Sequence, residues 1–158
     1  MEPDNEYSRL ELLAQQLNQA HRSAVSAELA ARGLGEIGHP VLMTILKYVE
    51  EAPEQSVSQR ALADLLYISP AAVANSLKSM ERGGYIRREP VERDARRNRV
   101  LLTDKGREAV EGCEEVFRCV ERRMFLDFTP EERALLIDMR ARMLRNLLGT
   151  TPAKKEEA

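Results

Sequence analysis

A sharp break between two short helical segments constrains the fold of this chain more than any other feature. Tyr67-Ile68 ends the first segment and Ser69-Pro70 starts the second, because Ser is a favoured N-cap and Pro is favoured at the first helical position. Both segments carry apolar residues at helical spacing, namely Ala61, Leu62, Leu65 and Leu66 in the first and Val73, Leu77 and Met80 in the second. This arrangement is typical of a helix-turn-helix, whose second helix enters the major groove of DNA.

A hairpin is predicted directly after this unit. Gly83-Gly84 ends the second helix, and the short segments 85–88 and 99–102 are β-like. Between them, Glu89–Asn98 is a polar stretch of ten residues, which we interpret as a long hairpin tip. A helix-turn-helix followed by such a hairpin is a winged helix-turn-helix.

Longer helices are predicted on both sides of the winged unit. They cover about residues 6–32 before it, with a short helix from Pro40 to near Pro53, and 103–123 and 129–149 after it. The expected fold class is mainly α (α+β): a winged helix-turn-helix with a two-stranded β-wing and long N- and C-terminal dimerisation helices. We place the winged domain at 38–103, the helical dimerisation region at 6–37 and 104–148, and a polar tail at 149–158.

The charge distribution matters more than the net charge of −2, which alone argues against a nucleic-acid partner. Residues 82–107 contain nine basic and four acidic residues, a net charge of +5. The rest of the chain has 15 basic and 22 acidic residues, a net charge of −7. Basic charge concentrated in one segment is the electrostatic signature of a nucleic-acid contact, and the acidic remainder would suppress indiscriminate binding.

The second helix of the unit leaves small and hydrogen-bonding residues on its outer side. We predict that these residues face DNA: Ser69, Pro70, Ala71, Ala72, Asn75, Ser76 and Ser79. Small side chains let the backbone approach the major groove, and Asn75 can pair with adenine through both the oxygen and the NH2 of its side-chain amide. The alternative is an ordinary solvated helix face.

The hairpin supplies the second predicted contact, through Arg93, Arg96, Arg97 and Arg99. Arginine binds phosphates in a fork geometry and suits the negative potential of a narrow minor groove. Asp94 can pair with a neighbouring arginine to hold the shape of the loop. The alternative is a basic solvated loop without a partner.

Four stretches resemble the MarR family of winged-helix transcriptional regulators. VSQRALADLLYISPAAVANSLKSMERGGYIRR resembles the family's helix-turn-helix, and GLGEIGHPVLMTIL resembles the segment before it. RDARRNRVLLTDKG resembles the family's wing signature, whose positions are filled by Asp94, Arg96, Leu102, Thr103 and Gly106. The long flanking helices resemble the dimerisation ends. The resemblance covers about residues 6–148.

This resemblance implies a homodimer on a pseudo-palindromic DNA operator, most simply a repressor, with Arg96 at the wing tip in the minor groove, Arg97 next, and Asp94 positioning it. Independently, apolar stripes on the terminal helices predict dimerisation through Leu10, Leu13, Leu17, Leu135, Met139, Met143 and Leu147. The alternatives are packing within one chain and, for the function, a protein-interaction module whose basic wing docks an acidic partner.

The family also implies release by a small aromatic ligand near the junction of the two regions. The polar or soft residues there are His21, His39, Met43 and Tyr48, which could equally be packing residues. Cys113 and Cys119 are expected to point to different helix faces as half-buried thiols, with oxidant sensing as the alternative.

No enzyme, cofactor or metal is expected, because the chain has neither a nucleophile–base pairing nor a metal-ligand or Gly-rich phosphate motif. No apolar run approaches the ~20 residues that span a bilayer. The polar start MEPDNEY is unlike a signal peptide, so we expect a cytoplasmic protein without a membrane partner.

Overall fold

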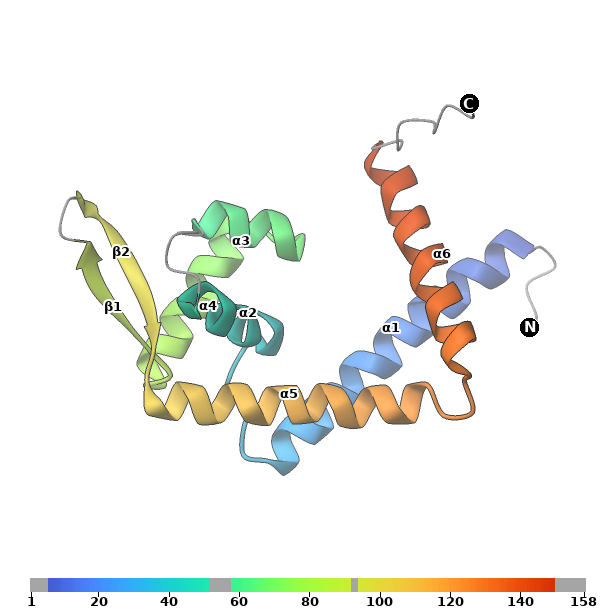
Figure 1. Cartoon of the computed structure of the whole chain (residues 1–158), viewed down its shortest axis with the longest axis horizontal. Helices are drawn as coiled ribbons and strands as arrows, with labels where there is room; N and C mark the ends of the chain where they lie inside the picture. The colour runs from blue at the N-terminus through green and yellow to red at the C-terminus, as the bar shows by residue number, and fades with distance from the viewer. Residues whose placement is uncertain (1–5, 52–57, 92–93, 150–158) are drawn as a thin grey trace. The chain divides into compact units, whose positions relative to one another are not determined.

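The computed structural model describes residues 6–51, 58–91 and 94–149 (Figure 1). The elements along the chain are α1 (Glu6–Ala31), α2 (Pro40–Glu51), α3 (Gln59–Leu66), α4 (Pro70–Arg82), β1 (Ile86–Val91), β2 (Asp94–Leu102), α5 (Asp104–Met124) and α6 (Pro130–Leu148). The predicted class, mainly helical with a two-stranded antiparallel sheet, is confirmed. Within the described residues, no helix is both long enough and apolar enough to pass through a membrane.

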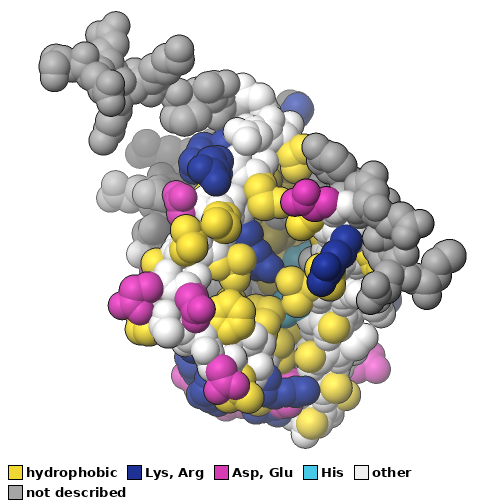
Figure 2. Space-filling view, turned by 90° about the vertical axis from the view of Figure 1, so that its right-hand side faces the viewer, with side chains coloured by type: hydrophobic (Ala, Val, Ile, Leu, Met, Phe, Trp, Pro, Cys, Tyr) yellow, Lys and Arg dark blue, Asp and Glu magenta, His cyan; other side chains and the backbone are white. Residues whose placement is uncertain are grey.

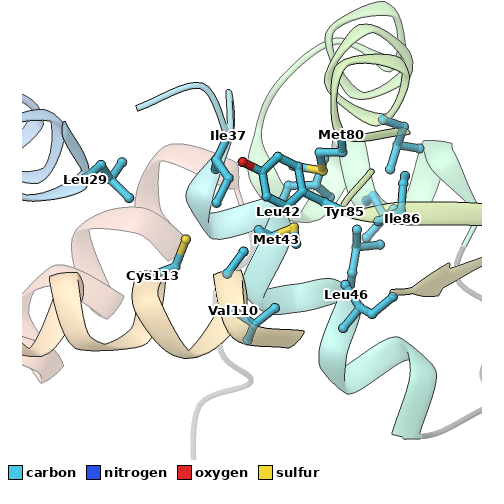
Figure 3. Close-up of a cluster of buried hydrophobic side chains, with 14 of the residues drawn as sticks. Leu29, Ile37, Leu42, Met43, Leu46, Met80, Tyr85, Ile86, Val110 and Cys113 are labelled. Atoms are coloured by element: carbon cyan, nitrogen blue, oxygen red, sulfur yellow. The ribbon is translucent and has the colours of Figure 1, made fainter. Parts of the chain in front are cut away.

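The described chain forms two compact units, the first ending at Val120 and the second beginning at Glu121. The first unit holds one continuous hydrophobic core to which α1 to α5 and both strands contribute. Figure 3 shows Val110 and Cys113 of α5 beneath Met43 and Leu42 of α2, with Tyr85 and Met80 on the far side. Leu42, Met43, Val73, Leu77, Cys113 and Val116 are fully buried.

Two ion pairs join α2 to α5 beside this core. The Lys47 ammonium lies 3.1 Å from a Glu114 carboxylate oxygen. Arg107 donates two hydrogen bonds to the Glu50 carboxylate, at 2.7 and 3.0 Å. These hydrogen bonds and the carboxylate charges raise the pKa of both cations. The two ion pairs therefore favour the same pairing of α2 with α5 as the packing of the apolar residues does.

The second unit is built around the start of α6. The Thr129 hydroxyl accepts a hydrogen bond from the Glu132 N–H at 3.2 Å, and the Glu132 carboxylate accepts one from the Thr129 N–H at 2.8 Å. This capping box starts α6 where Thr129-Pro130 predicted it. The Phe125 ring meets Phe128 edge-on, with centroids 5.5 Å apart. In the described structure no residue of α6 is buried.

The hairpin differs from the sequence prediction. We expected a ten-residue polar tip over Glu89–Asn98, but the ladder continues through it, pairing Glu89 with Arg99 and Pro90 with Asn98. The register shifts between Pro90 and Val91, and Val91 then pairs with Asp94. The prediction was wrong because it required apolar side chains for a strand. From Glu89 to Asn98 the sequence is mostly polar, so the pairing there is defined by the backbone ladder and not by apolar alternation.

Cys113 is fully buried, whereas both cysteines were expected to be half-buried; Cys119 is partly exposed. Burial raises the pKa of the Cys113 thiol to about 11, with a smaller contribution from the Glu114 charge. The thiolate is the reactive form, so the fold protects this thiol.

We predict that an aromatic disulfide reagent at pH 8 leaves Cys113 unmodified in the native Cys119→Ser variant and modifies it after unfolding. The raised pKa also means that the unfolded thiol ionises first. The contribution of the Cys113 thiol to the free energy of unfolding should therefore be complete below pH 9, the ordinary thiol pKa, and should decline as the pH rises toward 11. Rapid modification of the native variant would contradict this assignment.

Candidate nucleic-acid interface

The turn between α3 and α4 is defined by side-chain caps and one unusual backbone conformation. The Ser58 hydroxyl accepts a hydrogen bond from the Ala61 N–H, and the Ser69 hydroxyl accepts one from the Ala72 N–H, both at 3.1 Å. Between the helices, Tyr67 is in the left-handed region with φ of 54°. This conformation is uncommon for a non-glycine residue, and it reverses the chain in three residues. The predicted helix-turn-helix is therefore present.

The faces of α4 separate cleanly. Val73, Leu77 and Met80 are buried against the core, as the spacing predicted. On the opposite side of α4, four residues at helical spacing are all exposed: Ala71, Asn75, Lys78 and Arg82. This outer stripe presents a small residue, an amide and two cations in succession. It has the chemistry for base-edge and phosphate contacts in a major groove.

The predicted recognition residues divide into two groups. Pro70, Ala71 and Asn75 are exposed, whereas Ala72, Ser76 and Ser79 are partly buried at the side of the helix. Ser69 is exposed, but its hydroxyl oxygen already accepts the capping hydrogen bond. The sequence interpretation missed Lys78 and Arg82. Helical spacing counted from Ala71 would have found both.

The wing has the predicted basic character, although several of its charges are paired. The Arg88 Nε lies 3.3 Å from a Glu81 carboxylate oxygen, and the Arg87 Nε lies 3.0 Å from Glu89. Arg99 is exposed on β2. Asp94, Arg96 and Arg97 belong to β2, but their side chains, and all of Arg93, lie outside the described residues.

The base of the wing, residues 83–85 and 103–106, joins α4 to α5. The Lys105 ammonium donates a hydrogen bond to the Gly83 carbonyl at 2.6 Å and lies 4.5 Å from the centroid of the Tyr85 ring. The Thr103 hydroxyl donates to the Gly84 carbonyl at 2.6 Å. We call this set of contacts the wing-base clasp.

The predicted dimerisation residues are all exposed in the single chain. On α1, Leu10 is 60 % exposed, and Leu13 and Leu17 are also exposed. On α6, Leu147 is 85 % exposed, and the other three predicted residues, Leu135, Met139 and Met143, are exposed as well. A second set, absent from the prediction, is exposed on the opposite side of the helix: Ile137, Leu144 and Leu148. Hydrophobic side chains reach the surface over much of the face in Figure 2.

The four residues considered for a ligand have different surroundings. His21 is exposed on α1, and Tyr48 is 62 % exposed on α2. Met43 is fully buried in the core. The His39 Nδ1 accepts a hydrogen bond from the Leu42 N–H at 3.1 Å and so caps the start of α2. Across the described part of the chain, no three His, Cys, Asp or Glu residues are grouped so that they could hold a metal ion.

The fold and the exposed stripe of α4 define a winged helix-turn-helix protein. Residues 43–97 match the model of the MarR family. This segment, like the motifs quoted above, is therefore similar to the MarR family. Both curated relatives that match it are named as HTH-type transcriptional regulators.

One relative is YdgJ of Bacillus subtilis (strain 168), an uncharacterized HTH-type transcriptional regulator. It is 36 % identical over 106 residues, which cover 67 % of this chain and 62 % of YdgJ, slightly less than two thirds of that relative. Two crystal structures show the same fold at 24 % identity. Transcriptional regulator PA3341 has a TM-score of 0.69, covering 89 % of this chain and 98 % of that one. The S. aureus MepR–DNA complex has a TM-score of 0.65, covering 89 % and 96 %.

We predict that the Ser69 cap can be separated from any DNA contact made by Ser69. Ser69→Ala removes the acceptor for the Ala72 N–H and should lower the free energy of unfolding by about 1 kcal/mol. Ser69→Asp keeps a capping acceptor and should retain most of this stability, while its negative charge weakens binding to duplex DNA. Urea unfolding and fluorescence anisotropy measure the two effects. Equal stability of Ser69→Ala and the wild type would contradict the capping role.

Proposed function

We propose that this protein is a sequence-specific DNA-binding transcriptional regulator that acts as a homodimer on a pseudo-palindromic operator. The observation that carries the proposal is the outer stripe of α4, in which Asn75, Lys78 and Arg82 are exposed opposite a fully packed inner face. A helix held rigidly by its core face, with amide and cationic groups outward, matches the requirements of major-groove recognition. Its place of action is the cytoplasm.

Two comparisons support this proposal. YdgJ is named as a transcriptional regulator, and MepR, whose fold this chain shares, was crystallised with DNA. By analogy, α4 of each subunit enters a major groove, and the wing arginines, with Arg96 foremost, approach the neighbouring minor groove. Phosphate contacts would fix the register, and Asn75 would read a base.

Exposed apolar residues support the homodimer. Large contiguous apolar surface is rare on monomeric proteins and marks an interaction site. In α6 both sides of the helix carry such residues, so one neighbouring surface would not cover them all. A second copy of the chain, contributing its own α1 and α6, supplies apolar surface of the same kind.

We further propose that the protein is a repressor released by a small aromatic ligand. A ligand that binds the dimer better in a conformation with a different spacing of the two α4 helices would lower operator affinity by population shift. His21 and Tyr48, both exposed, offer polar and aromatic groups for such a ligand.

Selection of duplexes from a random DNA pool tests the central proposal. We expect enrichment of an inverted repeat that binds at about 10⁻⁸ M or tighter at physiological salt, with an affinity that falls steeply as salt rises. Lys78→Met should reduce the slope of log K against log salt by about 0.9, because one phosphate contact is lost. Asn75→Ala should cost about 1–3 kcal/mol on the selected site only.

Arg118→Met is the matched control. It also removes one positive charge, but Arg118 pairs with Glu115 on α5 and lies outside α4 and the wing. Its affinity and salt slope should equal those of the wild type. Failure to enrich any sequence, together with binding to acidic polypeptides, would favour the protein-interaction alternative.

The dimer is tested separately by sedimentation velocity. Met139→Glu places a charge on the exposed apolar side of α6 and should shift the protein from dimer to monomer at micromolar concentration. Asp138→Lys reverses a charge at an exposed position of α6 that lies on neither apolar side, and should leave the dimer intact. A wild-type protein that sediments as a monomer would contradict the proposal.

A further inference from the structure

We propose that Lys105 is a positioning residue for DNA binding: it fixes the end of α4 and the base of the wing in one orientation without contacting DNA itself. The inference rests on the proposed function, because it concerns how the two DNA-reading elements are held. It concerns a lysine that a count of basic residues would assign to the DNA-contacting charge.

The contacts of the Lys105 ammonium direct its charge inward. It donates to the Gly83 carbonyl at 2.6 Å, at the residue that caps the C-terminus of α4. A cation there satisfies a carbonyl and interacts favourably with the negative end of the helix dipole. The same ammonium lies 4.5 Å from the centroid of the Tyr85 ring, within range of a cation–π interaction. One charge therefore contacts both the C-cap of α4 and the Tyr85 ring of the wing base.

Thr103, which lies between β2 and α5, completes the clasp. Its hydroxyl donates to the Gly84 carbonyl at 2.6 Å and lies 3.1 Å from the Tyr85 carbonyl. Its N–H donates to the Tyr85 carbonyl at 3.0 Å. Carbonyl groups of three successive residues, 83–85, are thus bound by two residues at the start of α5. This part of the backbone has little freedom to rotate while the clasp is closed.

A further link ties the wing directly to α4. Arg88 of β1 pairs with Glu81 in the last turn of α4. The Tyr85 ring itself is buried among core residues that include Met80 of α4 (Figure 3). The wing base is therefore attached to the C-terminal half of α4 by an ion pair, by apolar packing and by the Lys105 ammonium. The last of these also connects both elements to α5.

The effect on binding follows from a population argument. Simultaneous contact of α4 with a major groove and of the wing with a minor groove requires one relative orientation of the two. If the protein adopts that orientation only part of the time, its apparent affinity falls by that fraction. Loss of the clasp would lower the competent fraction while leaving the contacts in the bound complex unchanged.

Two measurements distinguish this role from a phosphate contact. Using the duplex obtained by selection, we expect Lys105→Met to weaken binding roughly tenfold, the order expected for loss of a charged hydrogen bond, with the salt slope unchanged. Lys78→Met, by contrast, should reduce the slope by about 0.9. Lys105→Arg should restore most of the affinity, because a guanidinium can also donate to a carbonyl and lie over an aromatic ring.

Hydrogen exchange of the free protein supplies a readout that does not involve DNA. Lys105→Met should accelerate exchange of the Thr103 and Tyr85 amides, which donate to the Tyr85 and Met80 carbonyls, more than exchange in α5 around Val116. Arg118→Met should alter neither affinity nor exchange at these amides. All binding is measured at a temperature where thermal unfolding shows each variant to be fully folded.

Each outcome bears on the proposal. Unchanged affinity of Lys105→Met, or a reduced salt slope, overturns the positioning role while the proposed function stands. A wild-type protein that selects no duplex overturns the proposed function and this inference with it. Weakened binding with an unchanged slope, faster exchange at the two amides and rescue by Lys105→Arg supports it.

Discussion

The start of α5 depends on the close approach of Gly106 to the backbone of Tyr85. A Cβ at position 106 would lie 2.0 Å from the Tyr85 carbonyl oxygen, so only glycine allows α5 to begin there. This approach brings the start of α5 against the end of α4 and sets the point from which the helix runs. Ala109, Val110, Cys113 and Val116 then enter the core in register. The Gly that closes the wing motif is thus explained by a steric limit rather than by flexibility.

The ion pairs between α2 and α5 agree with this placement of α5. Lys47–Glu114 and Glu50–Arg107 join α2 to α5, the helices that carry the buried Leu46 and Val110. Partly exposed ion pairs contribute little stability individually. The two ion pairs instead specify which faces of α2 and α5 meet, because a rotation of α5 would separate both pairs and expose the apolar residues of α5. Packing supplies the stability here, and the charges add specificity.

The sequence predicted the elements wherever a local signal defines their ends. Ser69-Pro70, Thr129-Pro130 and Gly83-Gly84 act through backbone chemistry within a few residues, so helix boundaries could be inferred without tertiary information. The extent of β1 and β2 could not, since a ladder between polar strands leaves no apolar alternation. The outer face of α4 was predicted in part. Asn75 followed from its chemistry, whereas Lys78 was missed although helical spacing from Ala71 and Asn75 leads to it.

The net charge of residues 82–107 overstates the electrostatic attraction of this segment for DNA. Arg87, Arg88 and Arg107 are paired with carboxylates, and the Lys105 ammonium is bound to a backbone carbonyl and an aromatic ring. These four cations shape the wing and its attachment. Among the described side chains, exposed cations without such a pairing occur on both elements, Lys78 and Arg82 on α4 and Arg99 on the wing. Cations on two elements give full affinity for DNA only when both elements are held in the orientation that DNA requires. The geometry of the wing base is therefore as important for recognition as the charges themselves.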